Sequence, residues 1–340
     1  MARDFGATSG WLIAGSIVGA ALALYRRAPA RYNLHEKIVL ITGGSRGLGL
    51  LLAREFIKRG ARVAICARDE EELERLEDGS ELPAGRFLTC ACDLSDEDQV
   101  YAMIRRVGDT LGSIDVLVNN AGTIQVGPIE SQRHEDFEEA MNSNFWSAVN
   151  TTLAVLPGMQ ARKAGRIVNV TSIGGKIAVP HLLPYSASKF ALVGFSKGLR
   201  AELAKDGIVV TTIVPGLMRT GSPRNANFKG QHAAEYGWFV LSDSLPGISM
   251  DARKAAEHIV DACVAGKGEV VLGLPAQLAA ILEGVAPNLV EPLLGATNRW
   301  ILPAPAPTVQ SRKGFQSETP LTQSRLTSLT REAERNNNQL

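Results

Sequence analysis

Tyr185 and Lys189 stand at positions i and i+4 of the run Tyr185-Ser-Ala-Ser-Lys189, and Ser172 precedes them in the chain. On a helix this spacing places the phenol and the ammonium on one face. An unperturbed tyrosine has a pKa of about 10 and is a poor acid or base at neutral pH, but a nearby positive charge favours its phenolate. We therefore predict that Tyr185 transfers a proton and that the Ser172 hydroxyl donates a hydrogen bond to a substrate oxygen.

A glycine-rich turn lies earlier in the chain, between an apolar run at 37–42 and an amphipathic run at 47–59. Glycines let the backbone turn tightly and approach a pyrophosphate, and the N-terminus of the following helix offers free N–H groups. The turn therefore predicts a dinucleotide site. Its cofactor-binding residues are expected to be Gly43, Ser45, Arg46, Gly47, Leu48 and Gly49.

The end of the second predicted strand indicates which dinucleotide binds. The strand at 61–67 ends in Ala67, with Arg68 directly after it. An acidic side chain at this place would bind the ribose 2′-hydroxyl, whereas a basic one accommodates a 2′-phosphate. Arg68 and Arg46 favour NADP(H). The alternative is that Asp69 takes the hydroxyl and that Arg68 is only solvated.

Polar residues also follow the third and fourth predicted strands, at 86–92 and 114–119. Asp93 and Leu94 follow the third and could meet an adenine edge, although an aspartate in a turn or helix cap has the same pattern. Asn120, Ala121 and Gly122 follow the fourth and suit a backbone bend under a ligand, or a plain turn. Four cysteines and five histidines without clustering predict buried thiols and no metal site.

Short apolar runs alternate with longer amphipathic runs, which predicts a parallel sheet covered on both faces. The expected fold is an α/β, Rossmann-like, doubly wound sheet in a single domain at 35–275, with ligands at the carboxyl ends of the strands. The expected helices lie at 47–59, 69–76, 95–111 (with Ser95 as N-cap), within 134–162, and at 185–205. The remaining strands are expected at 166–171, 208–214 and 269–272.

In this order, the motifs resemble those of the short-chain dehydrogenase/reductase family, over about residues 37–272. The resemblance implies an oxidoreductase that interconverts an alcohol and a ketone or aldehyde with NADP(H). It implies that Tyr185 is the general acid/base, that Lys189 lowers the pKa of Tyr185 and binds the nicotinamide ribose, and that Ser172 orients the substrate. A catalytically silent NADP-binding sensor or scaffold of the same fold is the alternative function.

The same resemblance implies roles for further residues. Asn144 would support a proton-relay water, with Asn142 and Asn150 as alternatives. Pro215 and Gly216 follow the sixth strand, and the hydroxyl of Thr220 would meet the nicotinamide carboxamide. Family members of this kind commonly form homodimers or homotetramers through the helices around positions 144 and 185.

The N-terminal run at 5–25 contains no charged residue, and arginines follow it at 26, 27 and 31. A helix of this length reaches about 30 Å, the thickness of a bilayer core. We predict a single-pass membrane anchor with the catalytic domain facing the cytoplasm, although a cleaved signal or a helix packed on protein would also fit. An anchor indicates a lipophilic substrate.

The C-terminal part is expected to leave the common core. Residues 276–303 are leucine-rich and predict a helical extension that either packs on the core or forms an amphipathic patch for a membrane or subunit. Residues 304–340 are rich in Ser, Thr, Gln, Asn and Arg and predict a disordered tail. The segment 216–250 is expected to be an irregular insertion over the site. A net charge of +1 gives no indication of nucleic-acid binding.

Overall fold

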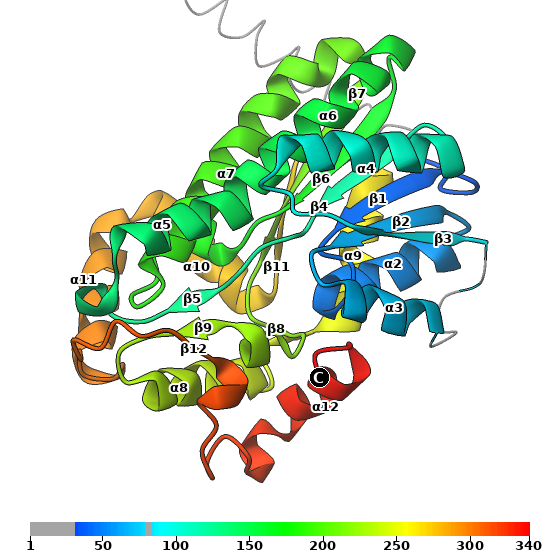
Figure 1. Ribbon diagram of the computed structural model, residues 1–340. Helices are drawn as coiled ribbons and strands as arrows, with labels where there is room; N and C mark the ends of the chain where they lie inside the picture. Colours follow the sequence, from blue (N-terminus) through cyan, green and yellow to red (C-terminus); the bar gives the residue numbers. More distant parts are fainter. Residues whose placement is uncertain (1–30, 79–82, 84) are drawn as a thin grey trace, which may run out of the picture.

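The computed structural model describes residues 31–78, 83 and 85–340. Its centre is a seven-stranded sheet in the order β11-β7-β6-β4-β1-β2-β3, and every neighbouring pair is parallel (Figure 1). The strand order reverses between β1 and β4, where a doubly wound sheet binds its ligand. The strands are β1 (Ile38–Thr42), β2 (Arg62–Ala67), β3 (Phe87–Ala91), β4 (Val116–Asn119), β6 (Gly165–Val170), β7 (Ile208–Pro215) and β11 (Glu269–Leu272). This architecture agrees with the expected Rossmann-like fold.

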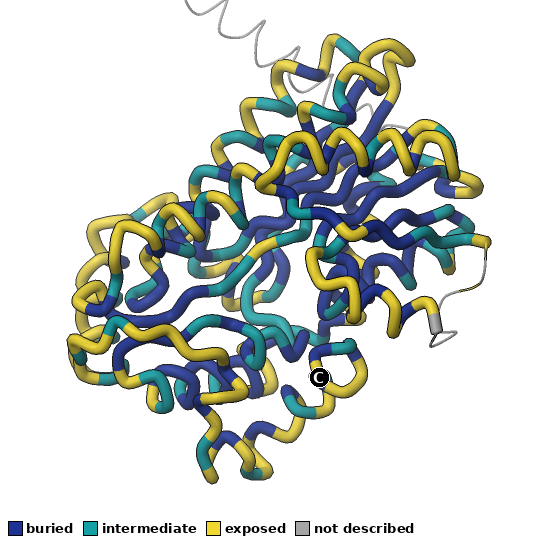
Figure 2. Tube along the Cα trace, in the orientation of Figure 1, coloured by how far each residue is buried: buried dark blue, intermediate teal, exposed yellow. Residues whose placement is uncertain are grey.

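Helices cover both faces of the sheet, which explains why its central strands are apolar throughout. On one face, α2 (Gly47–Lys58), α3 (Glu70–Asp78) and α9 (Ala252–Ala265) contribute to one hydrophobic cluster. On the other, α4 (Glu97–Thr110), α6 (Ser147–Arg162) and α7 (Leu183–Leu203) contribute to a second. Figure 2 shows the buried strands running between helices whose outer turns are exposed.

Two helical details differ from the sequence expectations. The N-cap of α4 is Asp96, whose side chain accepts a hydrogen bond from the Gln99 N–H, rather than Ser95. Ser95 instead donates its hydroxyl to Asp93. The long helix expected within 134–162 is also interrupted: α5 (His134–Met141) and α6 are joined by the π turn η2 (Asn142–Trp146). Such π turns are frequent at functional sites.

The segment at 216–250 is more regular than the expected insertion. It contains β8 (Met218–Arg219), η5 (Ser222–Asn225), β9 (Asn227–Phe228), α8 (His232–Ser244) and β10 (Met250–Asp251). Phe228 packs edge-on against Tyr236 and Phe239 in a third hydrophobic cluster. The aromatic residues of this segment therefore build a small core of their own beside the sheet.

The structure contradicts the expectation of a disordered tail at 304–340. This part of the chain forms β12 (Arg312–Lys313), η6 (Gly314–Gln316), η7 (Arg325–Thr327) and α12 (Ser328–Asn336). β12 pairs with β9, which also pairs with β5 (Gln125–Val126), and α12 packs beside α8. The residues that this segment buries are mostly hydroxyl and amide side chains, including Ser317, Thr322, Thr327 and Thr330. Hydropathy could not reveal such polar packing.

Residues 276–303 are mostly helical, as α10 (Leu274–Val285) and α11 (Pro287–Trp300). Both helices expose large apolar side chains, among them Leu278, Ile281 and Trp300. The predicted anchor at 5–25 lies outside the described residues. Across 31–78 and 85–340, no helix is both long and apolar enough to span a bilayer. The four cysteines, Cys66, Cys90, Cys92 and Cys263, are buried and unpaired.

Candidate active site

A cavity of about 1020 Å³ lies at the carboxyl edge of the sheet. Residues that follow β1, β2, β3, β4 and β6 line it, together with residues of α5, η2 and α7. Its volume is at the upper end of the range for small-molecule sites, about 300–1,000 Å³, so it can hold a ligand as large as a dinucleotide. Sequence-predicted residues from distant parts of the chain meet here. They are Gly43, Ser45, Arg46, Gly47, Leu48, Arg68, Asp93, Leu94, Asn120, Ala121, Gly122, Asn144, Tyr185, Lys189 and Thr220.

The glycine turn fits a phosphate group closely. Gly43 has φ +61°, and a Cβ at this position would lie 2.9 Å from the Cα of Ala121, so only glycine is compatible with the turn. The side-chain amide of Asn120 donates to the carbonyl oxygens of Thr42 and Gly43 and holds the turn in place. The N–H of Leu48 has no hydrogen-bond partner among the described residues, and Leu48 lines the cavity. A free N–H at a helix start is a donor for an anion.

Three residues predicted to bind cofactor do not line the cavity. A Cβ at Gly49 would lie 2.0 Å from the carbonyl oxygen of Gly43, so this glycine lets α2 pack under the turn. Pro215 is the last residue of β7, and Gly216 donates its N–H to Leu272. A Cβ at Gly216 would crowd Ala276. All three residues therefore shape the backbone at this edge of the sheet and do not face the cavity.

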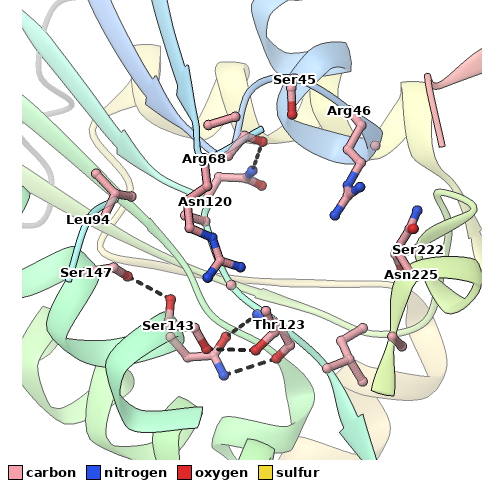
Figure 3. A pocket seen from close by; sticks show the side chains of 18 of the residues that line it. Ser45, Arg46, Arg68, Leu94, Asn120, Thr123, Ser143, Ser147, Ser222 and Asn225 are labelled. Carbon is pink, nitrogen blue, oxygen red and sulfur yellow. Dashed lines mark hydrogen bonds between the residues drawn. The ribbon is translucent and has the colours of Figure 1, made fainter. Parts of the chain in front are cut away.

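Cationic side chains gather at the β2 end of the cavity. Figure 3 shows the guanidinium groups of Arg46 and Arg68 directed into the open space of the pocket. Lys313 of β12 also lines this space, and burial together with repulsion by Arg46 and Arg68 lowers the pKa of Lys313. Glu72 opposes this charge because it pairs with Arg46 and accepts a hydrogen bond from the Ser45 hydroxyl at 2.6 Å.

The two aspartates near this end have structural partners. Asp69 accepts a hydrogen bond from the Glu72 N–H at 3.1 Å and so caps the start of α3. Asp93 accepts hydrogen bonds from both the N–H and the hydroxyl of Ser95, which lower the pKa of Asp93. Each aspartate also lines the cavity. In both cases, one carboxylate oxygen organises a turn.

Tyr185 and Lys189 line the cavity, and Ser172 lies beside Tyr185 but is not itself part of the cavity lining. Ser172 follows β6 and caps η3 (Ile173–Gly175), where its side chain accepts a hydrogen bond from the Gly174 N–H at 3.0 Å. A Cβ at Gly174 would lie 3.2 Å from the Tyr185 ring and 3.4 Å from the Ser172 Oγ, so both side chains converge over this glycine. Lys189 is 4% exposed, and its Nζ lies 5.8 Å from the centre of the Tyr185 ring.

Burial controls the protonation of both groups. It raises the pKa of Tyr185, and the hydrogen bond with Ser172 acts in the opposite direction. Burial lowers the pKa of Lys189 to about 8, although the ammonium donates to the Val170 carbonyl oxygen at 3.2 Å. The lowering of the Tyr185 pKa expected from Lys189 and an oxidised nicotinamide stays a prediction, because burial sets the direction of the shift in this structure. The penalty for burying a phenolate exceeds the effect of its hydrogen bond.

Among the three candidate asparagines, Asn144 has the most enclosed position. It lies in the π turn η2, and its amide oxygen and nitrogen bond the N–H and carbonyl oxygen of Thr123, each at 3.1 Å. The amide nitrogen also donates to Ser188 at 3.0 Å. A Cβ at Gly122 would lie 2.3 Å from the Asn144 oxygen and 3.4 Å from the Lys189 Nζ, which places the amide near the ammonium. Asn142 is exposed, and Asn150 bonds the Leu94 carbonyl oxygen.

The opposite wall of the cavity contains Thr220, which the family resemblance indicated, together with residues that no sequence motif marks. Thr220 lines the cavity and accepts a hydrogen bond from the Ser222 N–H at 3.1 Å. Ser222 and Asn225 lie beside it in η5, and Gln339 joins them from the end of the C-terminal segment. No local motif marks Lys313 or Gln339, because only tertiary packing brings them to the site.

A doubly wound sheet with a glycine turn at its switch point, and with Ser, Tyr and Lys at its carboxyl edge, defines a class of dinucleotide-dependent oxidoreductase. The chain belongs to the short-chain dehydrogenase family, whose sequence model matches residues 37–229. This membership makes the protein an oxidoreductase whose fold binds NAD(P).

Individual relatives extend the match beyond that range. The chain is 36% identical to a "Dehydrogenase/reductase SDR family protein 7-like" from Anopheles gambiae, over 84% of this chain and 93% of the relative. It is 34% identical to a "Fatty acyl-CoA reductase" from Acinetobacter baylyi, over 76% and 83% of the two chains. The solved structure of a gluconate 5-dehydrogenase from Burkholderia cenocepacia, in complex with NADP and tartrate, is 27% identical. The two structures superpose with a TM-score of 0.63, over 73% of this chain and 98% of the dehydrogenase.

Proposed function

We propose that this protein is an NADP(H)-dependent oxidoreductase that interconverts an alcohol and a ketone or aldehyde. The observation that carries the proposal is the convergence of Ser172 and Tyr185 over Gly174, beside the buried Lys189, where Tyr185 and Lys189 line the same cavity as the glycine turn. A bound nicotinamide dinucleotide supplies or accepts the hydride. The glycine turn, Arg68 and Lys189 would hold the dinucleotide, and Thr220 would meet its carboxamide.

The side chains divide the proton chemistry among them. Ser172 holds the substrate oxygen, and Tyr185 donates its phenolic proton to that oxygen during reduction or removes it during oxidation. The Lys189 ammonium stabilises the phenolate that reduction leaves. The remaining lone pair of the Asn144 amide oxygen can hold a water through which Tyr185 regains its proton. An ordinary phenol is already protonated at neutral pH, and burial raises the pKa of Tyr185 further, so the group can act as the acid in carbonyl reduction.

The experiment that tests this function is NADPH oxidation by the purified protein with a panel of lipophilic ketones and aldehydes. We expect Tyr185→Phe to reduce kcat by about 10²- to 10⁴-fold, the usual contribution of general acid/base catalysis. NADPH binding, followed by fluorescence, should persist because the ring remains. Tyr101→Phe, at an exposed position of α4, is the matched control. Full turnover in Tyr185→Phe would exclude the assigned role. NADPH binding without turnover of any ketone, aldehyde or alcohol would favour the silent sensor.

The preference for NADP(H) is proposed from Arg46, Arg68 and Lys313, and the NADP complex of the gluconate 5-dehydrogenase supports it. We expect Arg68→Ala to lower kcat/KM for NADPH by about 10- to 100-fold, as for the loss of a charge-assisted hydrogen bond, and to leave kcat/KM for NADH nearly unchanged. Arg105→Ala, on the exposed side of α4, should change neither value. If Asp69 instead binds a ribose hydroxyl, the wild type will prefer NADH and Arg68→Ala will have little effect.

The membrane assignment is a further part of the proposal. We propose that residues 5–25 form a single-pass anchor with the catalytic domain facing the cytoplasm, and that the substrate is lipophilic. The relative named as a fatty acyl-CoA reductase and the exposed apolar side chains of α10 and α11 support an apolar substrate. An anchored protein should stay in the membrane pellet after alkaline carbonate extraction, whereas a chain beginning at Arg31 should not. Release of the full chain by carbonate would overturn the anchor.

A further inference from the structure

The C-terminal segment, residues 312–340, ends beside the glycine turn. The segment starts as β12, which pairs antiparallel with β9 through Arg312↔Phe228 and Lys313↔Asn227. It then packs α12 against α8, where the Ser244 and Thr330 hydroxyls bond at 2.6 Å. Figure 1 shows the chain end lying next to α12 and below α2. The segment is therefore held along its length before it enters the site.

Residues 337–339 contact the wall of the cavity that the glycine turn forms. The Gly47 N–H donates to the Asn337 carbonyl oxygen at 2.8 Å. The Asn338 side-chain amide donates to the Ser45 carbonyl oxygen at 2.9 Å. A Cβ at Gly47 would lie 2.7 Å from the Gln339 Nε2, so the fit is close and depends on a glycine at position 47. These contacts secure the segment to the phosphate-binding turn.

Asn337 and Gln339 also contact the opposite wall of the cavity. The Asn337 side-chain amide donates to the Thr220 carbonyl oxygen at 3.1 Å. The Asn225 side-chain amide donates to Gln339 twice, to the backbone oxygen at 3.1 Å and to the side-chain oxygen at 2.7 Å. Residues 337–339 therefore bridge two walls that are otherwise separate parts of the fold. Removing the bridge would open the cavity on this side.

The bridge does not fill the cavity. Gln339 is one of the residues that line the volume of about 1020 Å³. The Leu48 N–H remains without a partner among the described residues and so stays available to a phosphate. Residues 336–339 have uncharged amide side chains, which do not repel an anion. The segment takes the Gly47 N–H but leaves the Leu48 N–H without a partner among the described residues, which is compatible with a cover over a bound dinucleotide.

We propose that residues 337–339 form a clasp that closes over the dinucleotide and that must open for the dinucleotide to enter or leave. The inference rests on the proposed function, because it needs a nicotinamide dinucleotide in the cavity. It adds a role for the C-terminal segment, which would set how fast the cofactor exchanges. Asn337, Asn338 and Gln339 are then positioning residues for cofactor retention.

Cofactor exchange kinetics test the clasp. The dissociation rate and the Kd of NADPH are measured by stopped-flow fluorescence on the full chain and on Gln339→Ala, Asn338→Ala and the double variant. We expect the double variant to raise both quantities about tenfold, which corresponds to about 1.4 kcal/mol. Gln323→Ala is the matched control, because Gln323 lies in the same segment and its side chain bonds only the exposed Glu318. This control should leave both quantities unchanged.

A double-mutant cycle separates the bridge from an indirect effect. Asn225→Ala and Gln339→Ala each break the bond between the two walls, so their effects on the NADPH dissociation rate should be non-additive. Additive effects, or unchanged rates in every variant, would overturn the clasp. A lower Kd in the variants would also overturn it and would show that the segment competes with NADPH. If the wild type and Gln323→Ala both fail to bind NADPH or NADH, the proposed function itself fails.

Discussion

Lys189 has to keep its charge in an environment that opposes it. The side chain is almost fully buried, and burial lowers the pKa of Lys189 to about 8. Its ammonium donates only to the Val170 carbonyl oxygen among the described residues, so no carboxylate offsets the desolvation. Lys189 is therefore charged at neutral pH and begins to lose this charge in mildly alkaline solution. The residue proposed to stabilise the phenolate can therefore change its protonation in mildly alkaline solution.

This sensitivity leads to a prediction about the pH dependence of reduction. Because Tyr185 stays protonated well above neutrality, kcat/KM for ketone reduction should be flat below pH 7 and should fall above about pH 8, as Lys189 deprotonates. Arginine stays protonated in this range, so the residual activity of Lys189→Arg should lack the alkaline limb. The measurement is the pH profile of kcat/KM for both proteins. An unchanged limb in Lys189→Arg would assign it to another group.

The residues of the catalytic end could be predicted because each belongs to a local pattern. Tyr185 and Lys189 are one helical turn apart, and Ser172 directly follows a buried strand, so position along an element fixes where each side chain lies. The glycine motif predicted that Gly49 contacts the cofactor, whereas the structure shows that it lets α2 pack under the turn. A glycine motif alone does not show which of its glycines face the ligand and which only make room for the backbone. Lys313 and Gln339 belong to no such pattern and reach the site only through tertiary contacts.

At the scale of elements, the contact between α8 and α12 includes buried carboxyl groups. Asp243 on α8 is 3% exposed and accepts a hydrogen bond from Thr330 at 3.5 Å. Burial raises the pKa of Asp243 to about 8, with an opposing effect of Arg219 and a smaller supporting effect of Glu334. Burial also raises the pKa of Glu334, on α12, to about 7. The folded protein therefore binds these protons more tightly than the unfolded chain does.

Protein stability should consequently decrease as the pH rises. The contribution of Asp243 is fully present below the ordinary carboxyl pKa near 4 and is lost progressively as the pH rises to about 8. We expect the free energy of unfolding in urea to fall from pH 5 to pH 9, and Asp243→Asn to reduce the slope. Asp98→Asn, exposed on α4, is the control and should keep it. Equal slopes for the wild type and Asp243→Asn would contradict this account.

The sheet strands were predictable because each is a short, largely apolar run, and in the central strands the apolar pattern reports burial directly. β1, for example, is Ile-Val-Leu-Ile-Thr and is buried at every position. The C-terminal segment shows the opposite case. Its buried positions are Thr, Ser, Asn, Gln and Glu, whose stability in the interior depends on hydrogen bonds rather than on hydrophobicity. A composition typical of disorder therefore concealed an ordered segment.

On the scale of the whole molecule, large apolar side chains are exposed around α6 and α7. Trp146, Leu153 and Phe190 have exposed fractions of 47%, 52% and 43%. Exposed apolar groups of this size commonly mark subunit contacts, so we propose this surface as the contact of the expected homodimer or homotetramer. The helices α10 and α11 present a second apolar surface, which includes Leu278. The two surfaces can be distinguished by introducing one charge into each.

We expect Leu153→Glu to shift the protein to a smaller species in sedimentation velocity, because a carboxylate would be desolvated at the contact. Leu278→Glu should leave the subunit number unchanged while weakening association with lipid vesicles. The opposite pattern would place the subunit contact on α10 and α11. A monomeric wild type would overturn the proposed oligomer.

The buried cysteines have a consequence for covalent chemistry. Burial raises the pKa of Cys92 to about 11 and of Cys263 to about 12, and it also raises the pKa of Cys66 and Cys90. Because the thiolate is the nucleophile, peroxides and maleimides should react very slowly with the folded chain, even at Cys92 in the cavity wall. Alkylation would then require the sheet to open. The rate of maleimide labelling at each cysteine would therefore report how often the part of the fold around that cysteine opens in solution.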